Sequence, residues 1–341
     1  MILFAPDSYG GFLTAPEAVA LAESALPGLV GHPMADGGEG SLEALAWHRP
    51  LRQRMVTVTG PYGEPVDATI GEHDGGSFIA SAQACGLRLT TRRSPLLATT
   101  YGVGQLLGAA SGPIRIGLGG SATIDCGMGM LQALGLALRD RQGRPLPAPI
   151  TAGQLRDVHS LTGTLPPLPP IAVLVDVAGP LEDAVSVYGV QKGLQPSEFE
   201  GHAAALRHTA ALLNRWRIEQ GWPALPVDLP GGGAAGGLGF ALAAVGGTLW
   251  WGAATFAEVT GLADAIQRAD AVVIGEGRLD ATSYRGKVAG VVSQLARSAG
   301  KPLLAVVGVA ADAPLPPTGP DRIIEINGMN RAAFQAAFRR L

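Results

Sequence analysis

The fold and chemistry of this chain are indicated most clearly by the stretch Gly117-Leu-Gly-Gly-Ser-Ala-Thr-Ile-Asp-Cys-Gly-Met-Gly-Met130. The β-branched residues Ile114 and Ile116 lead into it and predict a buried strand, and the apolar residues that follow predict a helix. Glycines let the backbone come close to a ligand, and amides at a helix start favour bound anions. The stretch therefore indicates a phosphate-binding turn, while turns of this composition also serve as packing devices.

Length and composition are typical of a globular protein with about two domains. Of the 341 residues, 47% are hydrophobic and 16% are charged, and the formal net charge of −3 gives no reason to expect a nucleic-acid partner. The two cysteines cannot build a disulfide framework or a cysteine-rich zinc site. The first residues, Met1–Asp7, lack a basic leader, so we expect a cytoplasmic protein.

One segment, Leu229–Ala257, contains no charged side chain and is long enough to cross a membrane. Its many glycines, Pro230 and the break at Gly246-Gly247 argue against a continuous span. We expect a buried helix followed by a strand, and no membrane association.

Short apolar runs near both ends of the chain are typical of buried parallel strands. They are Ile2–Ala5, Gly31–Met34, Ala271–Ile274, Leu303–Val307 and Ile323–Ile326. Helices are predicted between them at Ala15–Leu26, Ser41–Trp47, Gly261–Ala269 and Lys287–Ala299. Thr14 and Glu17 form a capping box that opens the first helix. Because the runs lie at the two ends of the sequence, we expect an α/β fold in which both termini build one doubly wound parallel-sheet domain.

The middle of the chain predicts a large inserted mixed α/β domain. Met55–Thr59 and Val66–Ile70 alternate in polarity around a turn and predict an antiparallel hairpin. Further strands are predicted at Ser77–Ala80, Ile114–Gly117 and Ile171–Val175, and helices at Gly102–Ala110, Met128–Leu138 and Glu198–Arg217. We assign residues 1–54 and 262–341 to the first domain and 55–261 to the insert.

Acids, glycines and cations recur together after the predicted strands. These clusters contain Asp7 and Ser8; Asp36, Gly37, Gly38 and Glu39; Gly119, Gly120, Ser121, Thr123 and Asp125; Asp176; and Glu276, Arg278, Asp280 and Lys287. One such cluster is more often a turn, but their repetition favours a binding site. Carboxylates at several strand ends suit Mg²⁺, and interspersed cations suit a phosphoryl group in transfer.

Other catalytic motifs are missing from the sequence. It contains no P-loop and no Gly-x-Ser-x-Gly elbow, and its six histidines show no metal-ligand spacing. Gly231–Gly236 matches a dinucleotide fingerprint by its letters, but it follows Leu229-Pro230 rather than a strand. We therefore do not expect NAD binding.

The clusters, in this order, resemble bacterial glycerate kinases. The matching segments are Ala5–Tyr9, Met34–Gly40, Val58–Pro61, Gly63–Val66, Pro95–Gly102, Gly119–Thr123, Tyr188–Gly193, Gly233–Gly239 and Gly275–Asp280. The resemblance implies phosphorylation of D-glycerate by ATP and Mg²⁺, with 2-phosphoglycerate as the favoured product. It also implies a flavodoxin-like domain built from both termini, an inserted α/β domain and an active site in the cleft between them.

Roles for single residues follow from the resemblance and from their chemistry. We predict ATP phosphates at Gly119, Gly120, Ser121, Thr123, Gly37 and Gly38, and Mg²⁺ at Asp36, Glu39, Glu276 and Asp280. Glycerate is predicted at Asp7, Ser8, Lys192 and Arg278, and catalytic roles at Asp125, Asp176, Lys287 and Arg278. Helix capping is the alternative for Asp36 and Asp125, and simple solvation the alternative for Lys287. We expect no partner beyond glycerate and ATP and leave a homodimer open.

Several positions depart from the family pattern. Gly10-Gly11 stands where the family usually has a lysine. Ile124 and Cys126, which flank Asp125, replace the residues usual at these positions, and so do Ala178 and Gly179, which follow Asp176. Two alternatives therefore remain open: a kinase of another small hydroxy acid, and a catalytically silent protein that binds a nucleotide or an organic acid.

Overall fold

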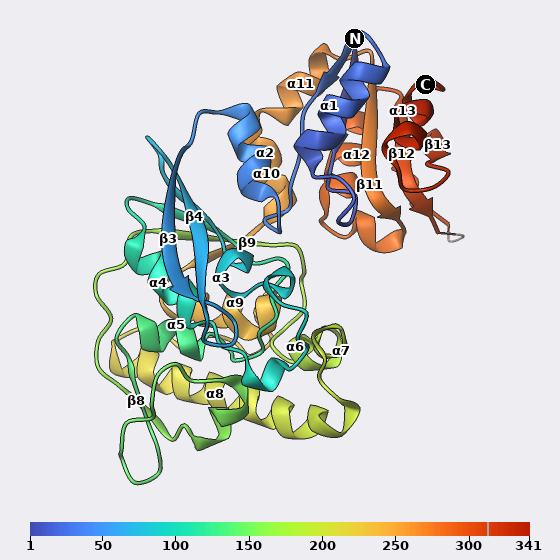
Figure 1. Ribbon diagram of the computed structural model, residues 1–341. Helices are drawn as coiled ribbons and strands as arrows, with labels where there is room; N and C mark the ends of the chain where they lie inside the picture. Colours follow the sequence, from blue (N-terminus) through green and yellow to red (C-terminus); the bar gives the residue numbers. More distant parts are fainter. Residues whose placement is uncertain (312–313) are drawn as a thin grey trace. The chain divides into compact units, whose positions relative to one another are not determined.

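The chain folds into two compact units in the computed structural model, which describes residues 1–311 and 314–341 (Figure 1). The terminal unit comprises residues 1–50 and 251–341, and the inserted unit comprises residues 51–250. The units thus divide at positions 50 and 250, whereas the sequence analysis placed the boundaries after 54 and 261. Helix α10 (Gly252–Thr260), which we assigned to the insert, belongs to the terminal unit.

A parallel five-stranded sheet forms the centre of the terminal unit. In spatial order its strands are β2 (Leu29–Gly31), β1 (Ile2–Pro6), β11 (Ala271–Leu279), β12 (Leu303–Ala310) and β13 (Arg322–Glu325). Counted within this unit the order is 2-1-3-4-5, which is the flavodoxin-like order. The prediction of a doubly wound parallel sheet built from both ends of the chain is confirmed.

Six helices of the described residues pack around this sheet. They are α1 (Ala15–Ala25), α2 (Ser41–His48), α10, α11 (Leu262–Arg268), α12 (Val288–Ser298) and α13 (Arg331–Phe338), with the 3₁₀ turn η5 at Ala281–Tyr284. Helices α1, α2, α11 and α12 lie close to their predicted positions, whereas α10 and α13 were not predicted. The capping box of Thr14 and Glu17 is present. Phe4, Phe334 and Phe338 are fully buried and meet edge-on or tilted, with ring centroids 4.7 and 5.0 Å apart. These aromatic contacts join α13 to β1.

A mixed six-stranded sheet forms the inserted unit. Its spatial order is β10 (Thr248–Trp251), β9 (Ile171–Val175), β6 (Ile114–Gly117), β5 (Gly76–Ala80), β4 (Pro65–His73) and β3 (Arg52–Thr59). Strands β3 and β4 form the predicted antiparallel hairpin, and β5, β6 and β9 run parallel. The parallel strands end at Ala80, Gly117 and Val175, so the glycine-rich stretch after β6 lies beside the residues that follow β5 and β9.

One predicted helix of the insert is wrong in its second half. We expected a helix over Met128–Leu138, but α5 covers only Met128–Ala133. Gly135 adopts a φ of +109°, which ends the helix because this backbone conformation is outside the helical region. The chain continues as β7 (Ala137–Arg139), which pairs antiparallel with β8 (Ser160–Thr162).

The remaining helices of the insert cover its sheet and support the loops at the strand ends. They are α3 (Ala82–Cys85), α4 (Tyr101–Ala109), α6 (Asp183–Ser186), α7 (Gly189–Lys192), α8 (Phe199–Glu219) and α9 (Ala234–Ala244), with 3₁₀ turns at Leu87–Leu89, Pro95–Leu97, Ala152–Asp157 (η3) and Pro196–Glu198. Helices α3, α6 and α7 are too short to give a periodic pattern, and they were not predicted.

The uncharged segment 229–257 forms buried helix α9 and strand β10, as expected. Across the described part of the chain, no helix combines the length and apolar character needed to cross a bilayer. The first turn of α9 is irregular, because Ala235, Gly236 and Gly237 all have positive φ. A Cβ atom on Gly236 would lie 2.0 Å from the carbonyl oxygen of Thr123. This glycine lets α9 pack against the stretch that follows β6.

We expect the Gly236→Ala variant to lose on the order of 3–5 kcal/mol of stability, because a rigid backbone carbonyl blocks the added methyl group. Gly246 is the matched control, since its φ is +96° but a Cβ atom there meets nothing within 4 Å. Gly246→Ala should lose only about 1–2 kcal/mol, from the backbone conformation alone. Urea unfolding followed by circular dichroism measures both, and equal losses would contradict the steric explanation.

Candidate active site

The predicted site residues fall into two clusters, one in each unit. The inserted unit holds Gly119, Gly120, Ser121, Thr123, Asp125, Asp176 and Lys192, and the terminal unit holds Asp7, Ser8, Asp36, Gly37, Gly38, Glu39, Glu276, Arg278, Asp280 and Lys287.

A buried ammonium group is the main feature of the inserted unit's cluster. Lys192, the last residue of α7, is only 4% exposed. Its Nζ donates hydrogen bonds to Ser121 Oγ at 2.9 Å and to the carbonyl oxygen of Thr123 at 2.8 Å. Burial lowers the pKa of Lys192 to about 8, partly offset by Cys85, Asp125 and Asp176. The group is therefore mostly cationic at neutral pH, and one of its three protons remains available to a ligand.

A cavity of about 100 Å³ lies against Lys192. Its walls are Leu87, Leu118, Gly119, Gly120, Ser121, Asp176, Val177, Tyr188, Gln191, Lys192, Ala234 and Ala235. Because a water molecule occupies about 30 Å³ in the liquid, this space suits a very small molecule or one terminal group of a larger ligand. An ammonium, a half-buried carboxylate and a glycine turn can together hold an anion and accept a proton.

The structure adds wall residues that the sequence analysis did not assign. Tyr188 and Gln191 belong to the segment Tyr188–Gly193 that carries the resemblance, so a motif was visible there without a role. Burial and then the charge of Asp176 raise the pKa of Tyr188, which keeps this phenol protonated. Ala234 and Ala235 belong to the matching segment Gly233–Gly239 and were likewise given no role; they lie at the irregular first turn of α9.

The carboxylate of Asp125 lies inside the protein, away from this cavity wall. It is fully buried, and Oδ2 accepts hydrogen bonds from the amide and hydroxyl of Thr100, both at 2.8 Å. The amides of Gly129 and Gly127 donate to Oδ2 and Oδ1, each at 3.2 Å. Burial raises its pKa despite these donors. In this position the carboxylate joins the starts of α4 and α5, and the catalytic role of Asp125 stays a prediction.

The predicted phosphate-binding residues of this unit are only partly at the cavity. Gly119, Gly120 and Ser121 line it, and Gly120 has a φ of +80°. The Thr123 side chain is fully buried, and only its carbonyl oxygen contacts Lys192. Thr123 therefore contributes through its backbone.

Three carboxylates interact at the strand ends of the terminal unit. Asp7 follows β1, Asp36 precedes α2 and Glu276 lies in β11. Burial and then the charge of Asp36 raise the pKa of Asp7, and burial raises the pKa of Glu276 to about 7. Lys287, at the N-cap of α12, opposes both shifts. The shifts of Asp7 and Glu276 indicate closely spaced negative charge that a cation would stabilise.

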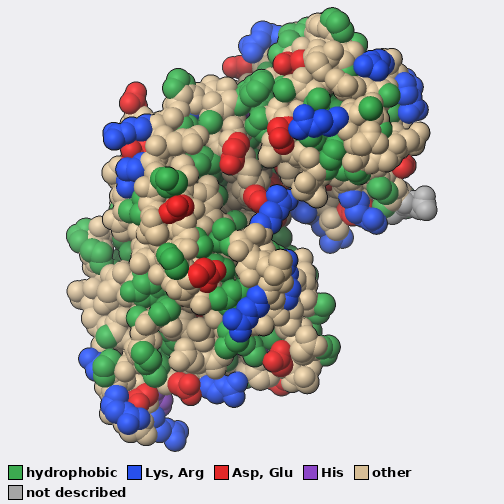
Figure 2. All heavy atoms as spheres, viewed as in Figure 1, with side chains coloured by type: hydrophobic (Ala, Val, Ile, Leu, Met, Phe, Trp, Pro, Cys, Tyr) green, Lys and Arg blue, Asp and Glu red, His purple; other side chains and the backbone are tan. Residues whose placement is uncertain are grey.

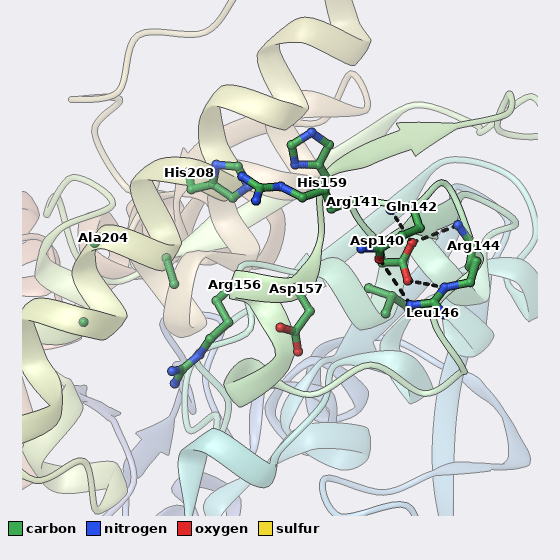
Figure 3. Close-up of a pocket in the computed structure, with 12 residues that line it drawn as sticks. Asp140, Arg141, Gln142, Arg144, Leu146, Arg156, Asp157, His159, Ala204 and His208 are labelled. Atoms are coloured by element: carbon green, nitrogen blue, oxygen red, sulfur yellow. Dashed lines mark hydrogen bonds and ion pairs between the residues drawn. The ribbon is translucent and has the colours of Figure 1, made fainter.

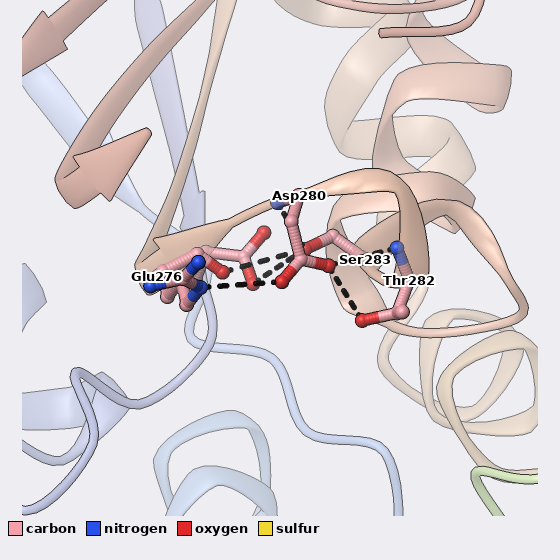
Figure 4. Close-up of polar contacts among 5 residues, drawn as sticks. Glu276, Asp280, Thr282 and Ser283 are labelled. Atoms are coloured by element: carbon pink, nitrogen blue, oxygen red, sulfur yellow. Dashed lines mark hydrogen bonds and ion pairs between the residues drawn. The ribbon is translucent and has the colours of Figure 1, made fainter. Parts of the chain in front are cut away.

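Glu276 offers a free oxygen within this cluster. Its Oε2 accepts a hydrogen bond from Ser283 Oγ at 3.0 Å (Figure 4), while Oε1 is buried with no hydrogen-bond partner in the described residues. Asp36 Oδ1 accepts from the amide of Gly38 at 3.0 Å, and Asp7 Oδ1 from that of Ser8 at 2.6 Å. The cluster thus keeps acceptor capacity on its carboxylates.

Two of the predicted metal ligands have other surroundings. Asp280 caps η5: Oδ1 accepts from the amide and hydroxyl of Thr282 at 2.8 and 2.6 Å, and Oδ2 pairs with Arg278 at 3.4 Å (Figure 4). Glu39 is exposed in the loop before α2. Within the described ranges, no three acids, histidines or cysteines are arranged to hold a metal ion by themselves. The Arg278 side chain is 67% exposed.

Comparisons with known proteins place the chain in a family. A family model described as "Glycerate kinase family" matches residues 2–336. Glycerate 2-kinase of Escherichia coli is 36% identical over 336 residues, covering 91% of this chain and 86% of that protein. Glycerate kinase of Bacillus subtilis is 37% identical over 328 residues, covering 90% and 84%. A crystal structure of a putative glycerate kinase 2 from Salmonella typhimurium superposes with a TM-score of 0.79 at 34% identity, covering 99% of this chain and 94% of that one.

We expect Asp125→Ala to destabilise the protein by about 3–5 kcal/mol, because buried donors on Thr100, Gly127 and Gly129 lose their acceptor. The matched control is Asp228→Ala, which removes an exposed carboxylate from the same unit and should change stability by less than about 0.5 kcal/mol. Urea unfolding measures both changes. An Asp125→Ala protein as stable as the control would return this residue to a purely catalytic role.

Proposed function

The chain belongs to the glycerate kinase family, and from this membership we propose that it transfers the γ-phosphoryl group of ATP to D-glycerate, giving 2-phosphoglycerate. A bond forms between the acceptor hydroxyl oxygen and phosphorus, and the bond from phosphorus to the bridging oxygen of ADP breaks. The hydroxyl proton passes to a base and ADP leaves. One observation carries the proposal: the buried ammonium of Lys192 shares a small cavity with Asp176 and the glycine turn.

Lys192 is the proposed anion-binding residue. Its ammonium is fixed by Ser121 Oγ and the carbonyl oxygen of Thr123, so it presents charge without having to reorganise. A buried cation gains more from an anionic partner than an exposed one does, because water screens it less. The glycerate carboxylate and the transferred phosphoryl group both have the oxygen atoms that this ammonium would contact.

Asp176 is the proposed base. Its side chain is half-buried and lines the same cavity as Lys192. A carboxylate there can orient the acceptor hydroxyl and take its proton as the bond to phosphorus forms. Asp125 is the weaker choice, because its oxygens already accept four hydrogen bonds inside the protein.

The carboxylates of the terminal unit are the proposed holders of Mg²⁺. Mg²⁺ usually binds one or two carboxylates, keeps several waters and uses phosphate oxygens for the rest, so it needs no complete protein cage. Asp36 and Glu276 fit this requirement, since Glu276 Oε1 is buried with no hydrogen-bond partner in the described residues. When bound, the ion would neutralise charge on the phosphates of ATP. Lys287 supplies a further positive charge near these acids.

Phosphorus NMR of the purified protein with D-glycerate, ATP and Mg²⁺ tests the proposed function. We expect 2-phosphoglycerate and ADP, and no product when EDTA removes the metal ion. A 3-phosphoglycerate signal would correct the position of transfer. Product only from other acids in a panel of small hydroxy acids would change the substrate, and ATP binding without product from any acceptor would indicate a silent binding protein.

The ionisation of Lys192 should appear in the pH dependence of the reaction. Above pH 8 its ammonium loses its proton, so kcat/KM for the acid substrate should fall about tenfold per pH unit. Lys192→Met should lower kcat/KM at pH 7 by at least about tenfold and remove this alkaline fall. Lys301→Met, which removes a lysine from the terminal unit, is the control and should keep the wild-type profile. An unchanged profile in the Lys192 variant would exclude this lysine as the titrating group.

A further inference from the structure

A second and larger cavity lies in the inserted unit. It measures about 740 Å³ and shares no wall residue with the Lys192 cavity. Its walls are Asp140, Arg141, Gln142, Arg144, Leu146, Arg156, Asp157, His159, Gly201, Ala204, Ala205 and His208 (Figure 3). They come from the loop after β7, from η3 and from one face of α8. We call this cavity the arginine pocket.

Small residues on α8 create the space. Gly201, Ala204, Ala205 and His208 are spaced by three and four residues, so they lie on one face of the helix. The first three have no side chain longer than a methyl group, so they leave room between α8 and the loop after β7. The His208 ring contacts the carbonyl oxygen of Val158 through Nε2 at 2.8 Å, which fixes one side of the pocket.

A compact turn holds the other side. Asp140 Oδ1 accepts hydrogen bonds from the amides of Gln142 and Arg144, both at 2.9 Å, and Oδ2 accepts from Arg144 Nε at 2.8 Å. The charges of Asp140 and Arg144 therefore offset each other. Figure 3 shows these contacts beside the pocket.

The arginine pocket contains two arginines, Arg141 and Arg156, whose guanidinium groups are available to a ligand. Arg141 and Arg156 form no hydrogen bond or ion pair with any described residue, and both are exposed. The charges of Asp140 and Arg144 offset each other, so Asp157 is the one remaining acid among the wall residues to oppose these two arginines. His159 and His208 add imidazole nitrogens to the walls. Figure 2 shows blue side chains gathered at this end of the inserted unit.

We propose that the arginine pocket binds a small phosphate-bearing molecule, distinct from the substrates at the Lys192 cavity. Its volume lies within the range of ordinary ligand sites. Guanidinium groups offer paired N–H donors that match phosphate oxygens, and their hydrated surroundings suit a polar rather than an apolar ligand. The two sites have no wall residue in common, so one molecule can occupy each of them.

Calorimetric titration with pyrophosphate, at constant ionic strength and without Mg²⁺, tests this site. We expect a saturable event in the wild-type protein that weakens at least tenfold in the double variant Arg141→Gln/Arg156→Gln. Ala204→Trp should weaken the same event, because the indole fills the pocket while every charge remains. The control double variant Arg215→Gln/Arg322→Gln removes two exposed arginines outside the pocket and should keep the wild-type affinity.

Three outcomes of the pyrophosphate titration would overturn the proposal, and one outcome with citrate would do so as well. The three are no saturable binding to the wild-type protein, unchanged binding in both pocket variants, and equal weakening in the control double variant, which would indicate only general charge attraction. Titration with citrate separates the ligand classes, since tighter binding of this phosphate-free anion would exclude a phosphate site. Circular dichroism melts of each variant confirm that folding is retained. None of these readouts depends on kinase activity.

Discussion

The buried carboxylate of Asp125 determines how the chain runs after β6. Removing a carboxylate from water costs several kcal/mol unless nearby donors replace the lost hydration. Backbone amides supply most of these donors, and they approach closely because glycine lacks a side chain. A Cβ atom on Gly129 would lie 2.3 Å from Thr99 Oγ1, and Gly127 has a φ of +67°. The glycines after Asp125 therefore let backbone amides reach its buried carboxylate. The earlier glycines of the stretch, Gly119 and Gly120, line the cavity.

The ammonium of Lys192 holds the same loop from its other side. Its hydrogen bonds to Ser121 and Thr123 fix the segment between the cavity and Asp125. Two buried charges of opposite sign thus act on consecutive parts of one loop, and Asp125 helps to keep Lys192 protonated. Lys192 nevertheless has a lowered pKa, because these partners do not fully compensate for burial. An anion in the cavity would add to this compensation, which fits the anion-binding role proposed for Lys192.

The sequence predicted the sheets well and the site only in part, for physical reasons. Hydrophobic periodicity is local, so four of the five parallel strands of the terminal unit and the hairpin β3–β4 were visible from neighbouring residues. The strand predicted at Gly31–Met34 lies instead at Leu29–Gly31. The end of α5 depended on the backbone of Gly135, which a helical pattern does not reveal. The partner of Asp125 is Thr100, twenty-five positions away, and no local pattern links them. Lys192 was assigned to glycerate from the resemblance and its charge, whereas Tyr188, in the same segment, was given no role because only the fold places it at the cavity.

Helix α8 contacts the loop after β6 and also lines the arginine pocket. His202, on its buried side, contacts the carbonyl oxygen of Ile124 through Nε2 at 2.8 Å. The adjacent residue, Gly201, lines the arginine pocket. One helix therefore supports the loop that carries Thr123 and Asp125 and also forms a wall of the second cavity. Both cavities are lined by residues of the inserted unit alone. The carboxylates proposed to hold Mg²⁺ lie in the terminal unit, so the proposed anion-binding and cation-binding groups belong to different units of one chain.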